Sequence, residues 1–285
     1  AKALADWCAG AGGQPREAVS HLQTALAARP GDRRLLQQLD DALRALHDTP
    51  RREALWSALP AALQARGDVT FALARLDLDC GRPAAAVARL TGTEFSVFEG
   101  GTAVRRLYVD ALLVGATEAL LAGDAALAES RCKLVFEYPE NLGAAGYLGE
   151  HSRLARYLLG VLAERAGRRD DARTWWNDVL ARAGAGVTYT VGGEGMARAG
   201  RLDEQLAILL ADKRVRGTVH AAPSAGTDLP ATADAAATVL CAAVAAATPT
   251  ATALARTALE RFPCDPLLRV LAQMARVEAA VSARG

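Results

Sequence analysis

Only a few residues of this chain have the types and spacing that catalysis requires. Glu99 and Glu140 are carboxylates on two separate segments, and a glycosidase uses a pair of carboxylates. Two glutamates on separate segments occur by chance in most proteins, so this pair does not predict catalysis. The four histidines stand at no spacing that builds a nucleophile or a metal site. They are His21, His47, His151 and His220.

The cysteines and the glycine-rich segments add no further site. The five cysteines are odd in number, far apart and without a Cys-x-x-Cys pair, which argues against zinc and against a disulfide framework. The segment Gly192-Gly193-Glu194-Gly195 lacks the preceding strand and the following lysine of a phosphate-binding loop. We therefore predict no catalytic residue, no metal site and no cofactor. Unpaired cysteines also favour a reducing, cytoplasmic location.

Composition excludes two classes of partner and predicts the fold class. With 33 basic and 32 acidic residues the net charge is +1, so no field of one sign exists to attract nucleic acid or a membrane surface. The uncharged run from Ala235 to Thr248 is mostly alanine and too short to span a bilayer. Helix formers dominate, and no segment alternates apolar and polar residues over the length of a strand. We expect an all-α protein.

A glycine followed five residues later by an alanine recurs along the chain. Each glycine is expected to end one helix, and each alanine to lie in the second turn of the next, as in a repeated helix–turn–helix unit. The copies are Gly13 with Ala18, Gly81 with Ala86, Gly123 with Ala128, and Gly167 with Ala172. Gly200 with Gln205 keeps the spacing without the alanine.

The intervals between these glycines predict where a repeat unit is degenerate and where loops are inserted. Gly13 and Gly81 are 68 residues apart, which is twice a period of about 34, so a degenerate unit should turn near His47, Asp48 and Pro50. The next two intervals are 42 and 44 residues long. They predict inserted loops at residues 91–101 and 138–150.

The central unit carries further residues of the same pattern. Leu159 and Gly160 form a Leu-Gly pair, and Trp176 follows Ala172 by four residues. A small residue lets two helices cross closely, and the large residue one turn later fills the space beside it. On these residues the chain resembles the tetratricopeptide-repeat family. The alternative is a generic alanine-rich helical bundle.

The resemblance implies one all-α domain over residues 1–285, a right-handed tetratricopeptide-like superhelix of about six to seven helical hairpins. Its first block would cover residues 1–100. The best-formed repeats, with the inserted loops, would cover residues 101–219, and a degenerate C-terminal repeat would cover residues 220–285.

The two predicted loops carry a second resemblance. Phe98-Glu99-Gly100-Gly101 and Pro139-x-Asn141-Leu142-Gly143 are similar to loops in large bacterial proteins that join an uncharacterised mutarotase-like N-terminal β-domain to a tetratricopeptide region. The resemblance implies a link to carbohydrate and a preceding domain. The chain also opens at Ala1 without a methionine or a polar capping repeat, and we expect it to be the C-terminal part of a larger protein.

Candidate partner-binding residues lie on the loops and on the first helices of two units. In the repeat family the first helices line the concave face, and register places Asp110, Thr117, Tyr157 and Glu164 on it. The alternative is that these residues bury one another. Loop residues can instead cover neighbouring helix ends, and Trp175 can pack between helices or contact a ligand. The remaining loop candidates are Phe98, Glu99, Tyr138 and Asn141.

These observations predict a non-enzymatic helical-repeat scaffold. Its partner would be a protein or peptide, or the missing N-terminal domain of the same protein. The alternative is an accessory module of a carbohydrate-active bacterial protein, with aromatic loops at the edge of a sugar site.

Overall fold

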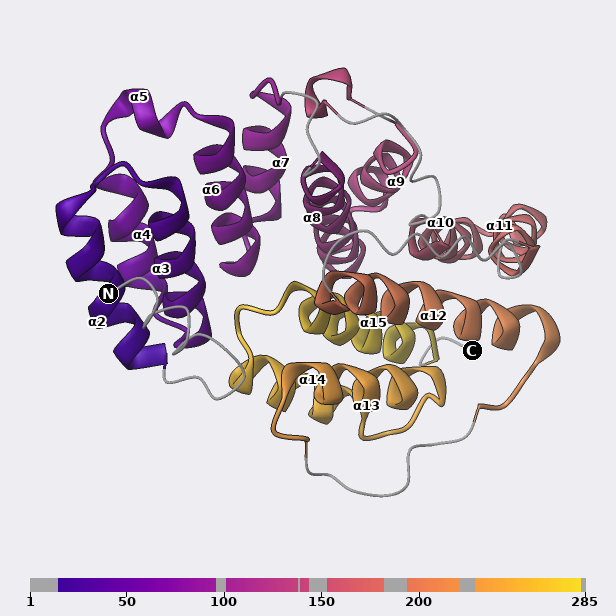
Figure 1. The fold of residues 1–285 in the computed structure, drawn as a ribbon. Helices are drawn as coiled ribbons and strands as arrows, with labels where there is room; N and C mark the ends of the chain where they lie inside the picture. Colours follow the sequence, from indigo (N-terminus) through magenta and orange to yellow (C-terminus); the bar gives the residue numbers. More distant parts are fainter. Residues whose placement is uncertain are drawn as a thin grey trace. The chain divides into compact units, whose positions relative to one another are not determined.

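All regular structure in the described part of the chain is helical (Figure 1). The computed structural model describes residues 15–95, 101–137, 139–143, 153–181, 194–220 and 229–282, with backbone alone at 15, 101–102 and 194–201. No strand occurs within these ranges, so the prediction of an all-α protein is confirmed for them. None of the helices in these ranges combines the length and the apolar character needed to cross a membrane.

The helices group into two compact units. The first unit comprises Ala1–Leu107 together with Asn141–Gly143, and the second comprises Tyr108–Glu140 together with Ala144–Gly285. The single domain with blocks at residues 1–100, 101–219 and 220–285 stays a prediction from the sequence. The long helix α8 (Gly101–Ala122) starts in the first unit and continues in the second.

Successive helices pack against one another in the first unit. Neighbouring pairs are α2 with α3, α3 with α4, α4 with α6, and α6 with α7. Asp32 and Asp48 cap the N-termini of α3 and α4 through their carboxylates, which fixes where these helices begin. The bounds are α2 (Pro15–Ala28), α3 (Arg33–Ala45), α4 (Thr49–Ser57), α5 (Ala61–Gln64), α6 (Gly67–Asp79) and α7 (Pro83–Thr91).

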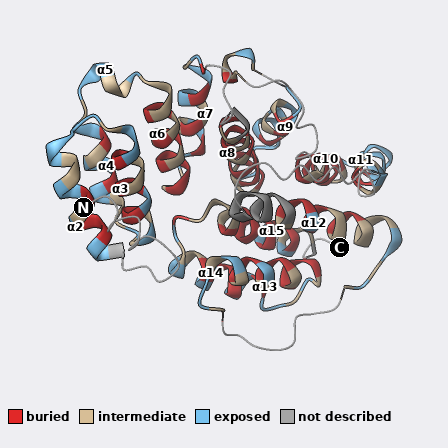
Figure 2. Cartoon of the chain, in the orientation of Figure 1, coloured by how far each residue is buried: buried red, intermediate tan, exposed pale blue. Residues whose placement is uncertain are grey.

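In the second unit each helix from α9 onward packs against the next, and α12 and α13 also pack against the last helix, α15. Figure 2 shows α10 and α15 buried over much of their length, which makes them inner helices. The bounds after α8 are α9 (Ala125–Leu134), α10 (Arg153–Arg165), α11 (Arg169–Ala181), α12 (Glu194–Arg216), α13 (Ala233–Ala245), α14 (Ala251–Arg261) and α15 (Pro266–Ser282). A short 3-10 helix, η1 (Glu140–Leu142), follows α9 in the chain.

Five helix–helix turns within the described ranges share one hydrogen-bond pattern. At each, the turn residue donates its N–H to the carbonyl three residues back, and the next residue donates to the carbonyl five residues back. The turn residue has a positive φ of +51° to +85°, as this C-terminal capping motif requires. The predicted turns at three glycines and at the degenerate unit near His47 are thereby confirmed. The turn residues are His47, Gly81, Gly123, Gly167 and Ala247.

The predicted turn at Gly200 is wrong. Gly200 lies inside α12, which continues to Arg216, and Gly217 with a φ of +71° follows the end of that helix. A glycine inside a helix costs only about 1 kcal/mol relative to alanine, so spacing alone did not distinguish a tolerated glycine from a turn. Gly13 lies outside the described residues.

The alanines that follow the turns lie at close helix contacts. Ala18, Ala86, Ala128 and Ala172 are each at most 1% exposed. Gly160 serves the same purpose on α10, because a Cβ atom there would collide with the indole nitrogen of Trp176 on α11. Small residues thus set how closely the paired helices approach, as the sequence analysis expected.

Candidate functional site

Two of the predicted partner-binding residues, Thr117 on α8 and Tyr157 on α10, are completely buried. The Thr117 hydroxyl donates to the side-chain oxygen of Gln273, and the Tyr157 hydroxyl donates to Glu278 Oε1 at 2.6 Å. Gln273 and Glu278 both belong to α15. The C-terminal helix therefore occupies the face on which the sequence placed an open groove.

This arrangement corrects the expectation of an open concave groove at these positions. Four apolar residues of the same two helices are also buried, each at most 3% exposed: Leu113, Leu120, Leu154 and Val161. The alternative, that these residues bury one another, describes the structure. A partner cannot contact Thr117 or Tyr157 while α15 stays in place.

Glu164, at the end of the same face, belongs to a charged network within the second unit. Arg214 on α12 lies between Glu164 and Glu278, with nitrogen–oxygen distances of 3.4 and 3.1 Å. Its guanidinium carbon is also 5.6 Å from the ring centroid of Trp176. Burial, together with the adjacent charge of Glu278, raises the pKa of Tyr157, so its phenol stays protonated. Asp110 is half-buried on α8.

Asn141 has a structural role that the sequence analysis named only as an alternative. Its side-chain amide nitrogen donates to the backbone carbonyls of Leu90 and Thr93, both at 2.8 Å. Its backbone carbonyl accepts from the Phe95 N–H at 2.7 Å. Phe95 is 6% exposed and lies beside Gly67 at the start of α6. Asn141 thus caps the end of α7 and fixes the start of the first predicted loop. Phe98, Glu99 and Tyr138 lie outside the described residues.

Trp175 packs against another ring instead of standing free. Its ring is nearly parallel to that of Phe136, with centroids 6.4 Å apart, and the guanidinium of Arg156 lies 4.5 Å from the Phe136 centroid. Phe136 remains 39% exposed and Trp175 is half-buried. The two rings therefore lie at the surface, and part of their area is in contact with each other and with Arg156.

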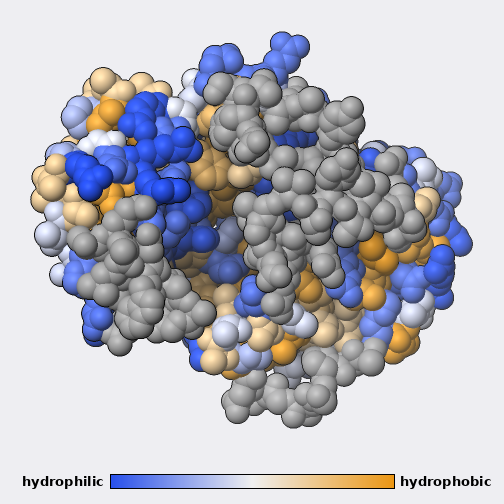
Figure 3. All heavy atoms as spheres, viewed as in Figure 1, coloured by the Kyte–Doolittle hydropathy of each residue, from blue (hydrophilic) through white to orange (hydrophobic). Residues whose placement is uncertain are grey.

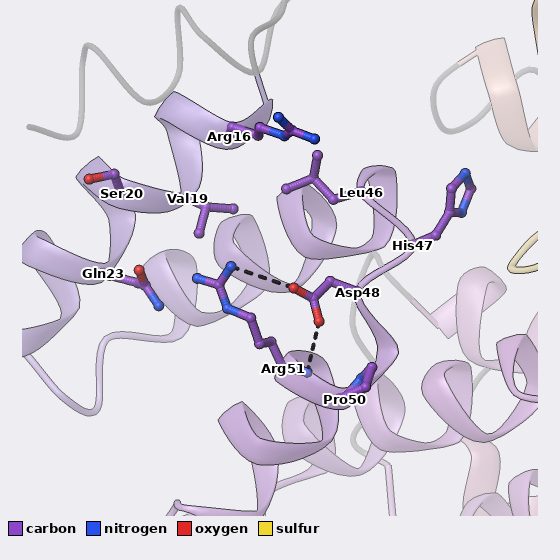
Figure 4. Close-up of a pocket in the computed structure, with 9 residues that line it drawn as sticks. All are labelled: Arg16, Val19, Ser20, Gln23, Leu46, His47, Asp48, Pro50 and Arg51. Atoms are coloured by element: carbon purple, nitrogen blue, oxygen red, sulfur yellow. Dashed lines mark hydrogen bonds and ion pairs between the residues drawn. The ribbon is translucent and has the colours of Figure 1, made fainter.

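An open depression in the first unit is a candidate site that the sequence analysis did not assign (Figure 4). It lies between the first two turns of α2 and the connection from α3 to α4, and its volume is about 610 Å³. This volume falls within the roughly 300–1,000 Å³ typical of ligand pockets. We call it the α2–α4 depression. Its lining residues are Arg16, Val19, Ser20, Gln23, Leu46, His47, Asp48, Pro50 and Arg51.

The α2–α4 depression combines an apolar floor with charged and polar walls. Figure 4 shows Val19 and Leu46 facing one another, while Arg51 reaches from α4 toward α2. Val19 is 3% exposed, whereas Arg16 and Arg51 are exposed. The sequence marked the turn at His47 but carried no signal that α2 would face it, because the two segments are separated along the chain.

The most buried charges of the first unit form a separate, internal network. Arg52 on α4 is completely buried and donates to both carboxylate oxygens of Asp40 and to Asp79. Asp40 also accepts from Trp56 Nε1 at 2.9 Å and from Arg75 at 2.6 Å. These groups join α3, α4 and α6. Because every carboxylate of this network faces an arginine, the network is suited to stability and offers no unpaired acid or base.

The repeat position of Arg52 is a sequence signal that could have identified this network. Arg52 stands five residues after His47, where the turns at Gly81, Gly123 and Gly167 are followed by a buried alanine. An arginine at a position of that kind signals a buried charge that needs acidic partners from neighbouring helices.

The described residues contain no group of three or more histidines, cysteines or acidic residues that could hold a metal ion. Burial raises the pKa of Cys132 and of Cys241 to about 12, so these thiols are poor nucleophiles. No protein-family model matches the chain, and no match was found among curated proteins or solved structures.

Proposed function

We propose that this chain is a non-enzymatic helical-repeat scaffold of the tetratricopeptide type that binds a protein partner. The partner would be a separate protein or an N-terminal domain of the same protein. The observation that carries the proposal is the recurrence of one hairpin: turns of the same hydrogen-bond pattern, with close-packed small residues on the helices beside them. Stacked hairpins of this kind present extended surfaces to partners.

The described ionisable groups support a binding role over catalysis. Their most buried members are engaged with one another, as in the Arg52 network of the first unit and the Glu278 network of the second. Perturbed groups at catalytic sites usually line a cleft, whereas these lie between packed helices. Figure 3 shows hydrophilic residues grouped on the visible face of the first unit, the kind of surface that contacts a polar partner.

Binding of short polypeptides tests this proposal directly. The 285-residue chain would be immobilised and used to select from a displayed library of random peptides about 12 residues long. Enriched peptides would then be resynthesised, and their affinity measured by fluorescence polarisation. We expect micromolar dissociation constants, which correspond to about −8 kcal/mol. A library from which nothing is enriched would contradict a peptide-binding scaffold.

A second candidate is an accessory module of a carbohydrate-active bacterial protein. The observation that favours it is the partly exposed Phe136 beside Trp175, since aromatic rings on a rigid scaffold can contact sugars. Binding of the chain to a glycan array, lost in a Trp175→Ala variant, would support this candidate. Peptide binding without glycan binding would leave the scaffold as the function.

The proposal also includes a reducing, cytoplasmic setting. Cys80, Cys132, Cys241 and Cys264 are free thiols, and such cysteines are typical of proteins kept in reducing compartments.

A further inference from the structure

We infer that the α2–α4 depression binds a segment of the protein partner in which an acidic side chain lies next to an apolar one. The inference rests on the proposed scaffold function and names the site and the chemistry of its ligand. Three properties of the depression carry it: the apolar floor, the balance of charge on its walls, and its openness along α2.

The apolar floor of the depression favours an apolar side chain on the ligand. Val19 and Leu46 face one another across the depression, and Pro50 lines its side. Val19 is nearly buried and Leu46 is half-buried, so an apolar group placed between them would be removed from water on several sides. Burial of apolar surface contributes about 25 cal/mol per Å², which favours a branched or aromatic side chain at this point.

The positively charged walls of the depression favour a negative charge on the ligand. Arg16 is exposed and has no hydrogen-bond or ion-pair partner among the described residues. Asp48, the one acid of the lining, already accepts from the backbone N–H of Arg51 at 3.1 Å and contacts the Arg51 guanidinium at 3.5 Å. Two guanidinium groups are therefore balanced by one carboxylate that is committed to capping α4. A second carboxylate between Arg16 and Arg51 would restore the balance and form charge-assisted hydrogen bonds.

The openness of the depression favours a polypeptide over a small molecule. Arg16, Ser20, Gln23 and Arg51 are all exposed, so the site cannot enclose most of a small ligand as tight pockets do. A peptide chain gains additional contacts beyond the depression. Ser20 and Gln23 stand on α2 where their side chains can exchange hydrogen bonds with the backbone of such a chain. Two arginines without a phenylalanine, tyrosine or tryptophan among the lining residues do not make a nucleic-acid site.

The test compares peptide binding by the whole chain and by matched variants. Arg16 and Arg51 are changed to serine together in the test variant. In the control variant, Arg34 and Arg173 are changed to serine. These two arginines are exposed on α3 and α11, and neither lines the depression. Both variants lose two positive charges, so a difference between them reports the site and not the net charge. Circular dichroism establishes that both remain folded.

We expect the random-peptide library to yield peptides in which Asp or Glu adjoins a large apolar residue. The test variant should bind them at least about tenfold more weakly, while the control stays within about twofold of the original chain. Replacing the acidic residue of the peptide by its amide should produce the same loss. The affinity should also fall as the salt concentration rises to about 0.5 M, because an exposed charge pair is screened.

Other outcomes overturn the inference in distinguishable ways. Peptides that bind the test variant as tightly as the original chain would refute the site and leave the scaffold function standing. Enriched peptides without acidic residues would refute the proposed ligand chemistry. A library that yields no peptide would refute both the inference and the scaffold function.

Discussion

Replacement of Arg52 by alanine is expected to destabilise the first unit strongly, although alanine is the usual residue at this repeat position. Arg52 makes three hydrogen bonds between helices: its Nε and Nη2 donate to Asp40 at 2.9 and 3.1 Å, and its Nη1 donates to Asp79 at 2.9 Å. The side chains of all three residues are fully buried. Removal of the guanidinium leaves two carboxylates in the interior with fewer partners.

The magnitude follows from the contacts that remain. Breaking a buried ion pair by removing one partner costs about 3–5 kcal/mol. Asp40 would keep its bonds from Trp56 and Arg75, and Asp79 would keep two bonds from Arg44. These remaining partners place the expected loss at the lower end, near 3 kcal/mol for the charge alone. The cavity left by the side chain adds to it.

Native-state hydrogen exchange, read by mass spectrometry, measures this loss where it occurs. Exchange in α3, α4 and α6 should accelerate by the factor that corresponds to about 3 kcal/mol, or roughly a hundredfold, since about 1.4 kcal/mol is tenfold. Exchange in α13, α14 and α15 should change little, because these helices belong to the second unit. An Arg52→Met variant keeps most of the side-chain volume and separates the charge effect from the cavity.

A double change provides the control for the proposed cause. If unpaired carboxylates are the source of the instability, adding Asp40→Asn to Arg52→Met should recover part of the loss. A loss below about 1 kcal/mol for Arg52→Ala would refute the reasoning, because the repeat position would then accept alanine without regard to the carboxylates.

Three further predictions concern acid, packing and thiols. Burial by itself would raise the pKa of Asp40, but the hydrogen bond and charge of Arg52, with Arg75 and Trp56, outweigh it and lower the pKa. The contribution of Asp40 to stability is therefore present above its unfolded-state pKa of about 3.9, and it is lost as the pH falls through its folded-state pKa. Urea unfolding should show this loss between about pH 5 and pH 2, and an unchanged midpoint would contradict it. Gly160→Ala should destabilise the packing of α10 on α11 by about 1–3 kcal/mol, because the added methyl group collides with Trp176. This cost should exceed the gain from alanine's better helix propensity. A higher melting temperature of the variant would show that the two helices do not need a glycine at their crossing. Cys132 and Cys241, whose pKa values burial raises to about 12, should resist iodoacetamide in the folded protein and react once it is unfolded, and rapid labelling of folded protein would show that they are accessible.

Local features of the fold could be predicted from the sequence because their partners lie within a few residues. A glycine at a helix end permits the positive φ that the capping motif needs, and the hydrogen bonds of that motif span three and five residues. Even the degenerate unit was found from the period alone, with His47 in place of glycine. The same local reasoning failed at Gly200, where a glycine is compatible with both a turn and a helix.

The candidate sites depended on partners that are distant in the chain. Thr117 meets Gln273 across 156 positions, and Tyr157 meets Glu278 across 121, so the closure of the predicted groove by α15 was not visible in either helix alone. Asn141 caps a helix that ended 50 residues earlier. Similarly, only the packing of α2 beside the His47 turn created the α2–α4 depression.

The sequence by itself therefore determined the all-helical class of the described residues, where most of their hairpins turn and which small side chains lie at the crossings. These properties follow from backbone hydrogen bonds and side-chain size within one or two helical turns. The tertiary structure decided which faces remain exposed and how the buried charges are paired, because both depend on which distant helix comes to lie against each face.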